Sequence, residues 1–293
     1  MGWDKYYEKI SLGPLMWFSR DDITEISRTH RVSHPFAEFL WRRTEHSVRT
    51  IELAEITAGK SILEVGCGTG SFTAALILAN QGKSYSIVAT DYSAEGVRAA
   101  SLRLKQLGLK GCSLIVADIL ALPFRQDAFD MVIAPSVIEH VPQQRQAMSE
   151  MVRVCKDRVI ISTDNSYGEL GSLGLGTFMA LGGKVLRKLR VLPESQVCFI
   201  SNKPQEFRRM AEGAGLDIEV FEFTHFSIPF FKTVLSLNKY LPSYCQNWLY
   251  KALSYLESRS GNSRFGWLHP MFIVVAAKRR LNHGVTASSG AWE

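Results

Sequence analysis

Paired cysteines, long apolar runs and a leader-like N-terminus are all missing from this 293-residue sequence. Its five cysteines include no CxxC pair, and their odd number leaves one unpaired in any disulfide scheme, which favours free thiols in a reducing compartment. The opening residues MGWDKYYEKI lack the apolar core of a secretory signal. The longest uncharged apolar stretch, 170–183, is too short and too rich in glycine to cross a bilayer. These absences predict a cytoplasmic protein.

The sequence also has no large excess of charge of either sign. The 34 lysines and arginines against 28 aspartates and glutamates leave a formal net charge of +6, a mild basic excess. The sequence has no basic strip interleaved with aromatic residues, the pattern typical of proteins that bind single-stranded nucleic acid. We therefore expect no nucleic-acid partner. A hydrophobic fraction of 46% and a charged fraction of 21% are instead typical of a globular protein.

Strand-like and helix-like runs alternate from about residue 57 to residue 165. The runs predict strands over 61–66, 84–91, 112–118, 129–136 and 158–164, and helices over 70–82, 93–108 and 144–155. Ser93 opens the second of these helices, and Glu95 lies in its first turn, which is a favourable capping arrangement. This alternation predicts a parallel sheet with crossover helices.

The regular alternation ends after the fifth predicted strand. A helix over 203–215 and strands over 217–226 and 271–279 follow, separated by long interruptions that include aromatic-rich, amphipathic stretches. We expect four parts, which are an N-terminal helical cap segment over 1–56, a domain over 57–280, cap insertions within it at about 165–200 and 227–268, and a disordered tail over 281–293. The caps carry enough apolar and aromatic surface to build a pocket.

The stretch SILEVGCGTGSF joins the first strand to its helix and packs three glycines close together. Glu64, Gly66, Gly68 and Gly70 form E-x-G-x-G-x-G, which differs from the G-x-G-x-x-G of dinucleotide-binding turns. The glycines let the backbone approach a ligand closely. A carboxylate at the end of the strand would repel a pyrophosphate and would suit a ligand that bears an ammonium group.

Two further acids end the neighbouring strands. Asp91 follows the second strand, where a carboxylate can accept hydrogen bonds from ribose hydroxyls. Asp118 ends the third, where it can accept from an exocyclic amine such as that of adenine. The carboxyl ends of adjacent strands are where open α/β sheets bind ligands. An ammonium group, a ribose and an adenine together describe S-adenosylmethionine.

With these residues in place, the sequence resembles the class I S-adenosylmethionine-dependent methyltransferases, in particular the small-molecule subgroup that includes quinone- and sugar-methylating enzymes. The matching stretches are ILEVGCGTGSFT, VATDYS, VADILALPFRQDAFDMVIAPSVIEHV and EMVRVCKDRVIIST. The resemblance implies an α/β, Rossmann-like, seven-stranded and mostly parallel sheet with helices on both faces and an antiparallel last strand. One departure is visible, because the Pro-Gly-Gly-like turn that usually precedes the fifth strand is missing.

The resemblance also assigns roles to single residues. It implies that Gly66, Cys67, Gly68 and Gly70 contact the methionine part of the cofactor, that Asp91 binds the ribose, that Asp118 and Ile119 bind the adenine, that Tyr92 flanks it, and that Glu64 and Pro135 complete the cofactor-binding set. Metal-dependent catechol methyltransferases carry Asp-Asn after the fifth strand, as Asp164 and Asn165 do here. Because Pro135 stands where the third metal ligand would be, we expect no metal and interpret Asp164 and Asn165 as turn residues.

A base is needed if the acceptor is a hydroxyl, because its proton must leave. His140, just after the fourth strand, is the best candidate, although a packing role is the alternative interpretation. Glu139 is interpreted either as a charge at a helix terminus or as an acid, and His225 is a weaker candidate.

The sequence thus predicts a methyltransferase that uses S-adenosylmethionine and a small-molecule acceptor, most directly an oxygen of a hydrophobic or glycosidic metabolite. One alternative is a lipid or quinone acceptor, with the protein held peripherally on a membrane through 227–268. A second alternative is a non-catalytic partner protein that binds the cofactor. The sequence indicates no oligomeric state.

Overall fold

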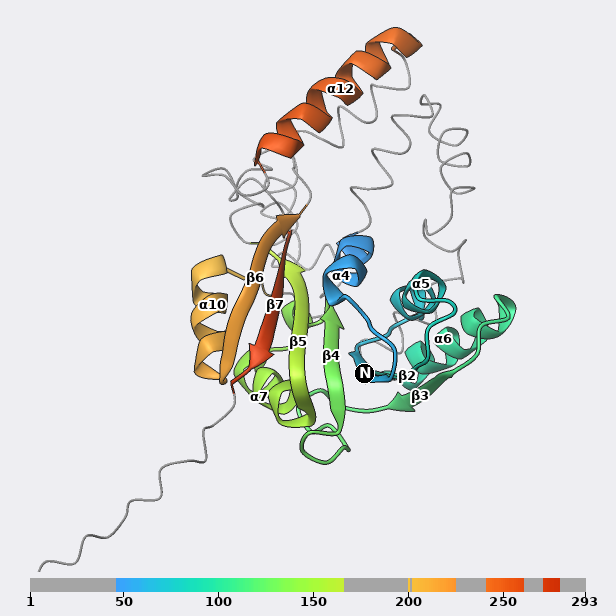
Figure 1. Cartoon of the computed structure of the whole chain (residues 1–293), viewed down its shortest axis with the longest axis vertical. Coiled ribbons are helices and arrows are strands. Elements are labelled where there is room, and N and C mark those ends of the chain that lie inside the picture. Colours follow the sequence, from blue (N-terminus) through green and yellow to red (C-terminus); the bar gives the residue numbers. More distant parts are fainter. Residues whose placement is uncertain (1–45, 166–199, 201, 225–240, 261–270, 280–293) are drawn as a thin grey trace, which may run out of the picture.

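The computed structural model describes residues 46–165, 200, 202–224, 241–260 and 271–279 (Figure 1). In chain order the elements are α4 (His46–Ala54), β1 (Lys60–Val65), α5 (Ser71–Ala79), β2 (Tyr85–Asp91), α6 (Ala94–Gln106), β3 (Cys112–Val116), β4 (Phe129–Pro135), the 3-10 helix η1 (Ile138–His140), α7 (Gln144–Val154), β5 (Cys155–Asp164), α10 (Pro204–Gly213), β6 (Leu216–Thr224), α12 (Ser243–Ser260) and β7 (Met271–Lys278). Several of the expected segments lie wholly or partly outside the described residues. They are most of the N-terminal cap, nearly all of the 165–200 insertion, both ends of the 227–268 insertion and the tail. His225 also lies outside the described residues.

The strands form one sheet in the order β3-β2-β1-β4-β5-β7-β6. The first five strands of this order pair in parallel, whereas β7 is antiparallel to both of its neighbours, β5 and β6. The predicted fold class is therefore confirmed. Because β1, β2 and β3 run in parallel, their carboxyl ends, with Val65, Asp91 and Val116, meet at one edge of the sheet.

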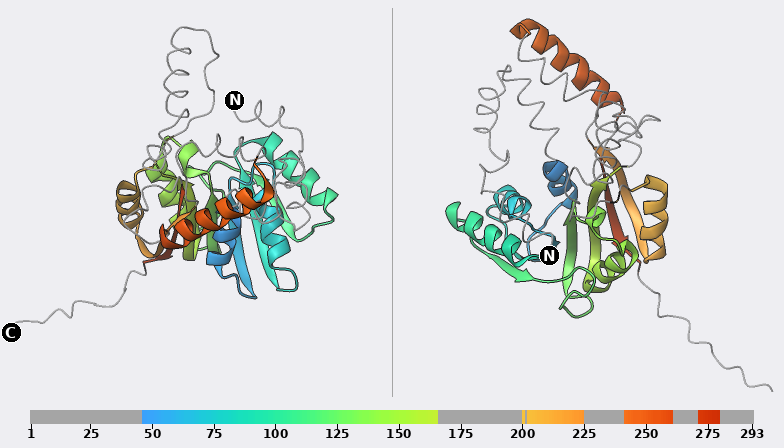
Figure 2. Two further views of the ribbon diagram at one scale, coloured as in Figure 1. Left: turned by 90° about the horizontal axis from the view of Figure 1, so that it is seen from above. Right: turned by 180° about the vertical axis from the view of Figure 1, so that it is seen from behind.

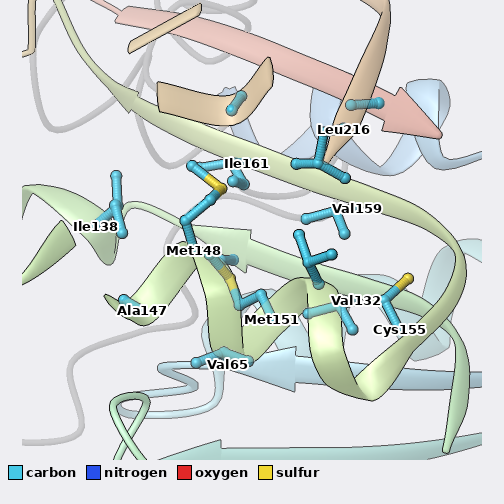
Figure 3. Close-up of a cluster of buried hydrophobic side chains, with 14 of the residues drawn as sticks. Val65, Val132, Ile138, Ala147, Met148, Met151, Cys155, Val159, Ile161 and Leu216 are labelled. Atoms are coloured by element: carbon cyan, nitrogen blue, oxygen red, sulfur yellow. The ribbon is translucent and has the colours of Figure 1, made fainter. Parts of the chain in front are cut away.

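Helices cover both faces of the sheet, as the two views of Figure 2 show. On one face α7 and α10 pack over a cluster that includes Met148, Met151 and Phe207, and Figure 3 shows the two methionines beside Val159 of β5. On the other face α4, α5 and α6 cover a second cluster. Strand residues alternate between the two, so that Val132 faces the first cluster and Ile133 the second.

Helix α4 lies in the segment expected to be an N-terminal cap. Its last residue, Ala54, is fully buried, and Ile56 just beyond it packs in the same cluster as α5 and the central strands. The helix is therefore part of the layer that covers the sheet. The division of the chain at residue 56 stays a prediction.

The fifth strand differs from its prediction at both ends. It begins at Cys155, directly after Val154 of α7, rather than at residue 158. The helix passes into the strand without intervening residues, which is consistent with the missing Pro-Gly-Gly-like turn. At the other end, the interpretation of Asp164 and Asn165 as turn residues is wrong, because Asp164 still pairs with Met271 and the fully buried Asn165 forms a bridge with Asn202.

Helix α12 confirms that the second aromatic-rich stretch of the 227–268 insertion is helical. It lies on the side of the sheet toward which β4 and β5 run (Figure 1). Tyr244, Trp248 and Tyr255 of this helix are exposed, Trp248 by 71%. Among the described helices, none is both long enough and apolar enough to span a membrane.

Candidate functional site

A cavity of about 350 Å³ lies where the carboxyl ends of β1, β2 and β3 meet the segment after β4. Its wall consists of Val65, Gly66, Asp91, Tyr92, Ala117, Asp118, Ile119, Leu120, Val137, His140, Val141, Pro142 and Gln143. Six of the residues predicted from sequence are in this wall, namely Gly66, Asp91, Tyr92, Asp118, Ile119 and His140. They come from four separate segments of the chain, so the fold brings them together.

The loop between β1 and α5 forms one side of the cavity. The Gly66 backbone is left-handed, with φ of 76°, and its N–H donates to the Thr90 carbonyl at 2.7 Å. A Cβ added at Gly66 would lie 2.2 Å from a methyl carbon of Val137, which also lines the cavity. A side chain at this position would therefore force the loop away from the segment after β4.

Gly70, for which the resemblance implied contact with the methionine part of the cofactor, lies next to Ala100 of α6. It does not line the cavity, and a Cβ there would lie 2.9 Å from the Cα of Ala100 on α6. The missing side chain thus lets the start of α5 pack closely against α6. Gly68 and Cys67 also lie outside the cavity wall, behind Asp91 and Gly66.

The Asp91 carboxylate ties the loop to the next helix. Its Oδ2 accepts from the Gly68 N–H at 2.7 Å, and its Oδ1 accepts from the Ser93 N–H at 2.8 Å. Ser93 in turn caps α6 by accepting from the Gly96 N–H, which confirms the predicted cap. An ionised carboxylate offers about four acceptor sites, so a carboxylate that lines a cavity can bond both backbone N–H groups and ligand hydroxyls. Asp91 is 8% exposed, and what it exposes faces the cavity.

Asp118 and Tyr92 form the far side of the same cavity. The Asp118 Oδ1 accepts from the Leu120 N–H at 2.8 Å, which fixes the turn after β3 and leaves Oδ2 outside that bond. Ile119 is buried beside it. The Tyr92 ring is 60% exposed at the cavity. An acceptor oxygen, an apolar side chain and an aromatic ring are together suited to a flat, aminated heterocycle.

Glu64 is fully buried behind the loop and does not line the cavity. Neither of its carboxyl oxygens has a hydrogen-bond partner among the described residues. Burial raises the pKa of Glu64 to about 8, and the nearby Asp91 charge adds to this rise; the Thr73 hydroxyl lowers it somewhat without bonding geometry. Burial, with these two carboxylates, also raises the pKa of the Cys67 thiol. An unpaired buried carboxyl next to a cavity is a candidate partner for a cationic ligand.

In the segment after β4, the side chains of Glu139 and His140 have different environments although the two residues are neighbours in sequence. His140 is half-buried and lines the cavity, whereas Glu139 is 2% exposed and its Oε2 accepts from the Thr163 hydroxyl at 3.0 Å. Burial raises the pKa of Glu139 to about 7. Just before this segment Ser136 is left-handed with φ of 54°, a strained backbone of the kind that clusters at functional sites.

Sequence reasoning missed several residues of the wall. Leu120, Val137 and Val141 give the cavity apolar surface next to the polar groups of Asp91 and Asp118. All of them follow β3 or β4 closely, so their position after a predicted strand was the available signal. Pro135 is buried at the end of β4 and does not reach the wall.

No group of three or more His, Cys, Asp or Glu side chains that could hold a metal ion occurs in the described part of the chain. The expectation of a metal-free enzyme stays a prediction, and no residue of the cavity is assigned to a metal here.

The known proteins of similar sequence and fold that are described below are methyltransferases or occur in a complex with a methyltransferase activator. The profile of a family described as "Methyltransferase domain" matches residues 56–218. A demethylmenaquinone methyltransferase of Bacillus cytotoxicus is 30% identical over 196 residues, which are 63% of this chain and 79% of that protein.

Two solved structures share the fold. One chain of a complex that contains the Haloferax volcanii Trm112 methyltransferase activator superposes with a TM-score of 0.56 and 14% identity, covering 90% of this chain and 99% of that one. A SAM-dependent methyltransferase from Aquifex aeolicus gives a TM-score of 0.51 and 15% identity, with 89% and 99% covered.

Proposed function

We propose, from the premise that this chain belongs to the class I S-adenosylmethionine-dependent methyltransferases, that it methylates an oxygen of a small hydrophobic or glycosidic metabolite. The premise rests on the family match over more than half of the chain and on the curated relatives. The chain is an enzyme that uses S-adenosylmethionine and a small-molecule substrate. The relatives thus give no support to the non-catalytic cofactor-binding protein that the sequence left open.

The observation that carries this proposal is the convergence of Gly66, Asp91 and Asp118 on one cavity. We propose that Gly66 lies against the methionine part of the cofactor, that Asp91 binds the ribose hydroxyls, and that Asp118 with Ile119 binds the adenine, flanked by Tyr92. Glu64 would act from behind the loop, where a bound ammonium group would favour its ionised form over the neutral form that burial favours. Gly68 and Cys67 would support Asp91, and Gly70 the packing of α5.

The residues present fit the cofactor chemically. The buried Glu64 carboxyl without a partner suits an ammonium group, and Gly66 without a side chain leaves room for the methionine part. The carboxylates of Asp91 and Asp118 suit the ribose hydroxyls and the adenine amine. When bound, the cofactor supplies a methyl group that its sulfonium has already activated. The chain itself holds the acceptor in line and keeps water out with Leu120, Val137 and Val141. Such positioning contributes roughly 7–11 kcal/mol in favourable models.

A second candidate acceptor is a quinone or lipid met at a membrane surface. Two observations favour it, namely the demethylmenaquinone methyltransferases among the relatives and the exposed aromatic residues of α12. We propose that the insertions at 165–200 and 227–268 cap the site in either case. Exchange of Trp248 and Tyr255 for serine should then reduce co-sedimentation of the full chain with anionic liposomes, whereas equal recovery of both proteins would remove this candidate.

The test of the main proposal uses S-adenosylmethionine with a tritiated methyl group and a fractionated metabolite extract. We expect label to move into a small molecule that organic solvent extracts, and NMR of the labelled product would show whether the methyl group is on oxygen. Label found only in protein or nucleic acid would contradict a small-molecule acceptor.

A further inference from the structure

The start of α7 contributes to the wall of the cavity. Pro142 and Gln143 directly precede this helix, and both line the cavity. The Gln143 side chain is exposed, and it does not cap the helix although Gln143 stands at the N-cap position. Asparagine, aspartate, serine and threonine are the residues that cap helices well, so capping does not account for a glutamine here. The helix therefore makes no use of the Gln143 amide group.

Two hydrogen bonds fix how α7 lies along the segment that follows β3. The Gln146 side-chain amide donates to the Leu120 carbonyl at 3.0 Å. One turn further along the helix, the Glu150 Oε2 accepts from the Leu122 N–H at 2.9 Å. Residues three or four apart on a helix share one face, so Gln146 and Glu150 both face this segment. Gln143 comes three residues before Gln146, at the start of the same face.

This arrangement brings Gln143 toward the end of β3. Each step toward the start of α7 moves the contact back along the segment, from Leu122 to Leu120. The next step reaches Asp118 and Ile119, which line the same cavity as Gln143. Gln143 also borders a hollow between α7 and α10, but of these two only the cavity has strand-end carboxylates in its wall. The geometry thus places Gln143 and Asp118 at the same end of the cavity.

An adenine ring needs two kinds of partner at this end. Its exocyclic amine donates hydrogen bonds, whereas the ring nitrogens N1 and N7 accept them. A carboxylate such as that of Asp118 only accepts, so it can pair with the amine but not with a ring nitrogen. The nearby Leu120 N–H already donates to Asp118 Oδ1. A glutamine amide has N–H donors, and in DNA recognition glutamine pairs with adenine through the amine and a ring nitrogen.

We propose that Gln143 is a specificity-determining residue for the adenine of the cofactor. Its side-chain amide donates a hydrogen bond to N1 or N7 of the base, while Asp118 accepts from the amine. This inference rests on the proposed function and adds a residue from the start of α7 to the same site. Because the two side chains together match a donor and an acceptor of the base, a ligand that lacks either group should bind less tightly.

The test is a binding cycle that changes the ligand and the protein in turn. Isothermal titration calorimetry on the full chain compares S-adenosylhomocysteine with its 1-deaza and 7-deaza analogues, in each of which a C–H group replaces one ring nitrogen. The wild type should bind one of these analogues about three- to tenfold more weakly than S-adenosylhomocysteine, as expected for the loss of a neutral hydrogen bond. Gln143→Ala should lose a similar factor for S-adenosylhomocysteine and should no longer distinguish it from that analogue. Such non-additive losses indicate a direct contact.

Gln143→Glu separates the hydrogen bond from packing, because it keeps the size of the side chain and removes the donor. At pH 8, where a carboxylate only accepts, this variant should bind S-adenosylhomocysteine at least as weakly as Gln143→Ala. The matched control is Gln126→Ala, which changes an exposed glutamine of the turn before β4. It should keep the affinity of the wild type and its preference among the three ligands.

Affinities of Gln143→Ala and Gln143→Glu within twofold of the wild type would overturn the proposal. It would also be overturned if Gln143→Ala bound all three ligands more weakly by the same factor, because the amide would then contact neither ring nitrogen. If the wild type itself failed to bind S-adenosylhomocysteine, the proposed function would fail instead, so the two failures are distinguishable.

Discussion

Among single residues, Asp91 connects the most parts of the site. Its two oxygens accept from the Gly68 and Ser93 N–H groups, and the residue also lines the cavity. The same carboxylate therefore shapes the loop and presents an acceptor to the ligand. Removal of the Asp91 carboxylate should disturb the loop and also take away an acceptor for the ligand. Asp91→Asn, a neutral variant of similar size, can separate these two effects.

Asp91→Ala should weaken binding of S-adenosylhomocysteine by at least about tenfold, because hydrogen bonds to a charged group contribute about 1.5–3 kcal/mol each. Isothermal titration calorimetry measures this directly. Asp91→Asn should keep part of the loop geometry and lose less affinity. The matched control is Asp217→Ala, which removes an exposed carboxylate paired with Arg279. Near-normal affinity of Asp91→Ala would contradict its role at the ribose.

At the same scale, His140 lines the cavity and stays the predicted general base. His140→Ala should then lower the rate of methyl transfer about 100- to 10,000-fold and leave the affinity for S-adenosylhomocysteine near that of the wild type. Initial rates with labelled S-adenosylmethionine and calorimetry provide the two measurements. An unchanged rate in His140→Ala would leave His140 with a packing role only.

At the scale of elements, the loop between β1 and α5 shows that similar glycines serve different contacts. The missing side chain of Gly66 lets the loop lie close to Val137, and that of Gly70 lets α5 lie against α6. Both are left-handed, with the same φ of 76°. The sequence pattern alone gave them one common role.

Gly66→Ala and Gly70→Ala should therefore differ in their effects. Each should lower the free energy of unfolding by roughly 1–3 kcal/mol, since an added methyl group overpacks its site. Gly66→Ala should also weaken cofactor binding, and adding Val137→Ala should recover part of that loss because it removes the nearest atoms. Urea unfolding and calorimetry are the measurements. Equal loss of affinity in both single variants would count against this distinction.

The sequence predicted the elements whose signals are local and missed the contacts that join distant segments. Periodicity placed β1, α5, β2 and α6, and the strand-end acids placed one side of the cavity. The buried position of Glu139 depends on Thr163, 24 residues away, and on Asn202 beyond an insertion. No local pattern reports such a contact. For the same reason Asn165 was interpreted as a turn residue, although it forms an isolated bridge with Asn202 just after β5.

For the whole molecule, two buried carboxyls link stability to pH. Folding raises the pKa of Glu64 to about 8 and that of Glu139 to about 7, from an ordinary 4.5. The folded chain thus binds these protons more tightly than the unfolded chain. Their contribution to stability is complete below about pH 4.5 and is lost as the pH rises through 7 and 8.

The free energy of unfolding should accordingly fall between about pH 5 and pH 8 by a few kcal/mol from these groups. Glu64→Gln should flatten this fall and should be the more stable protein at pH 8, because it removes an unpaired buried acid. Urea denaturation across this range checks the slope. A wild-type stability that rises over the same interval, with Glu64→Gln unchanged from it, would contradict the burial of Glu64.

The whole account depends on the adenosyl group lying between the second and third strands. A crystal structure of the chain with S-adenosylhomocysteine tests this most directly. The account predicts ribose hydroxyls within hydrogen-bond distance of Asp91 and the adenine amine at Asp118, beside Ile119 and Tyr92. Density for the nucleoside at any other place, with Asp91 still turned only to the Gly68 and Ser93 N–H groups, would contradict it.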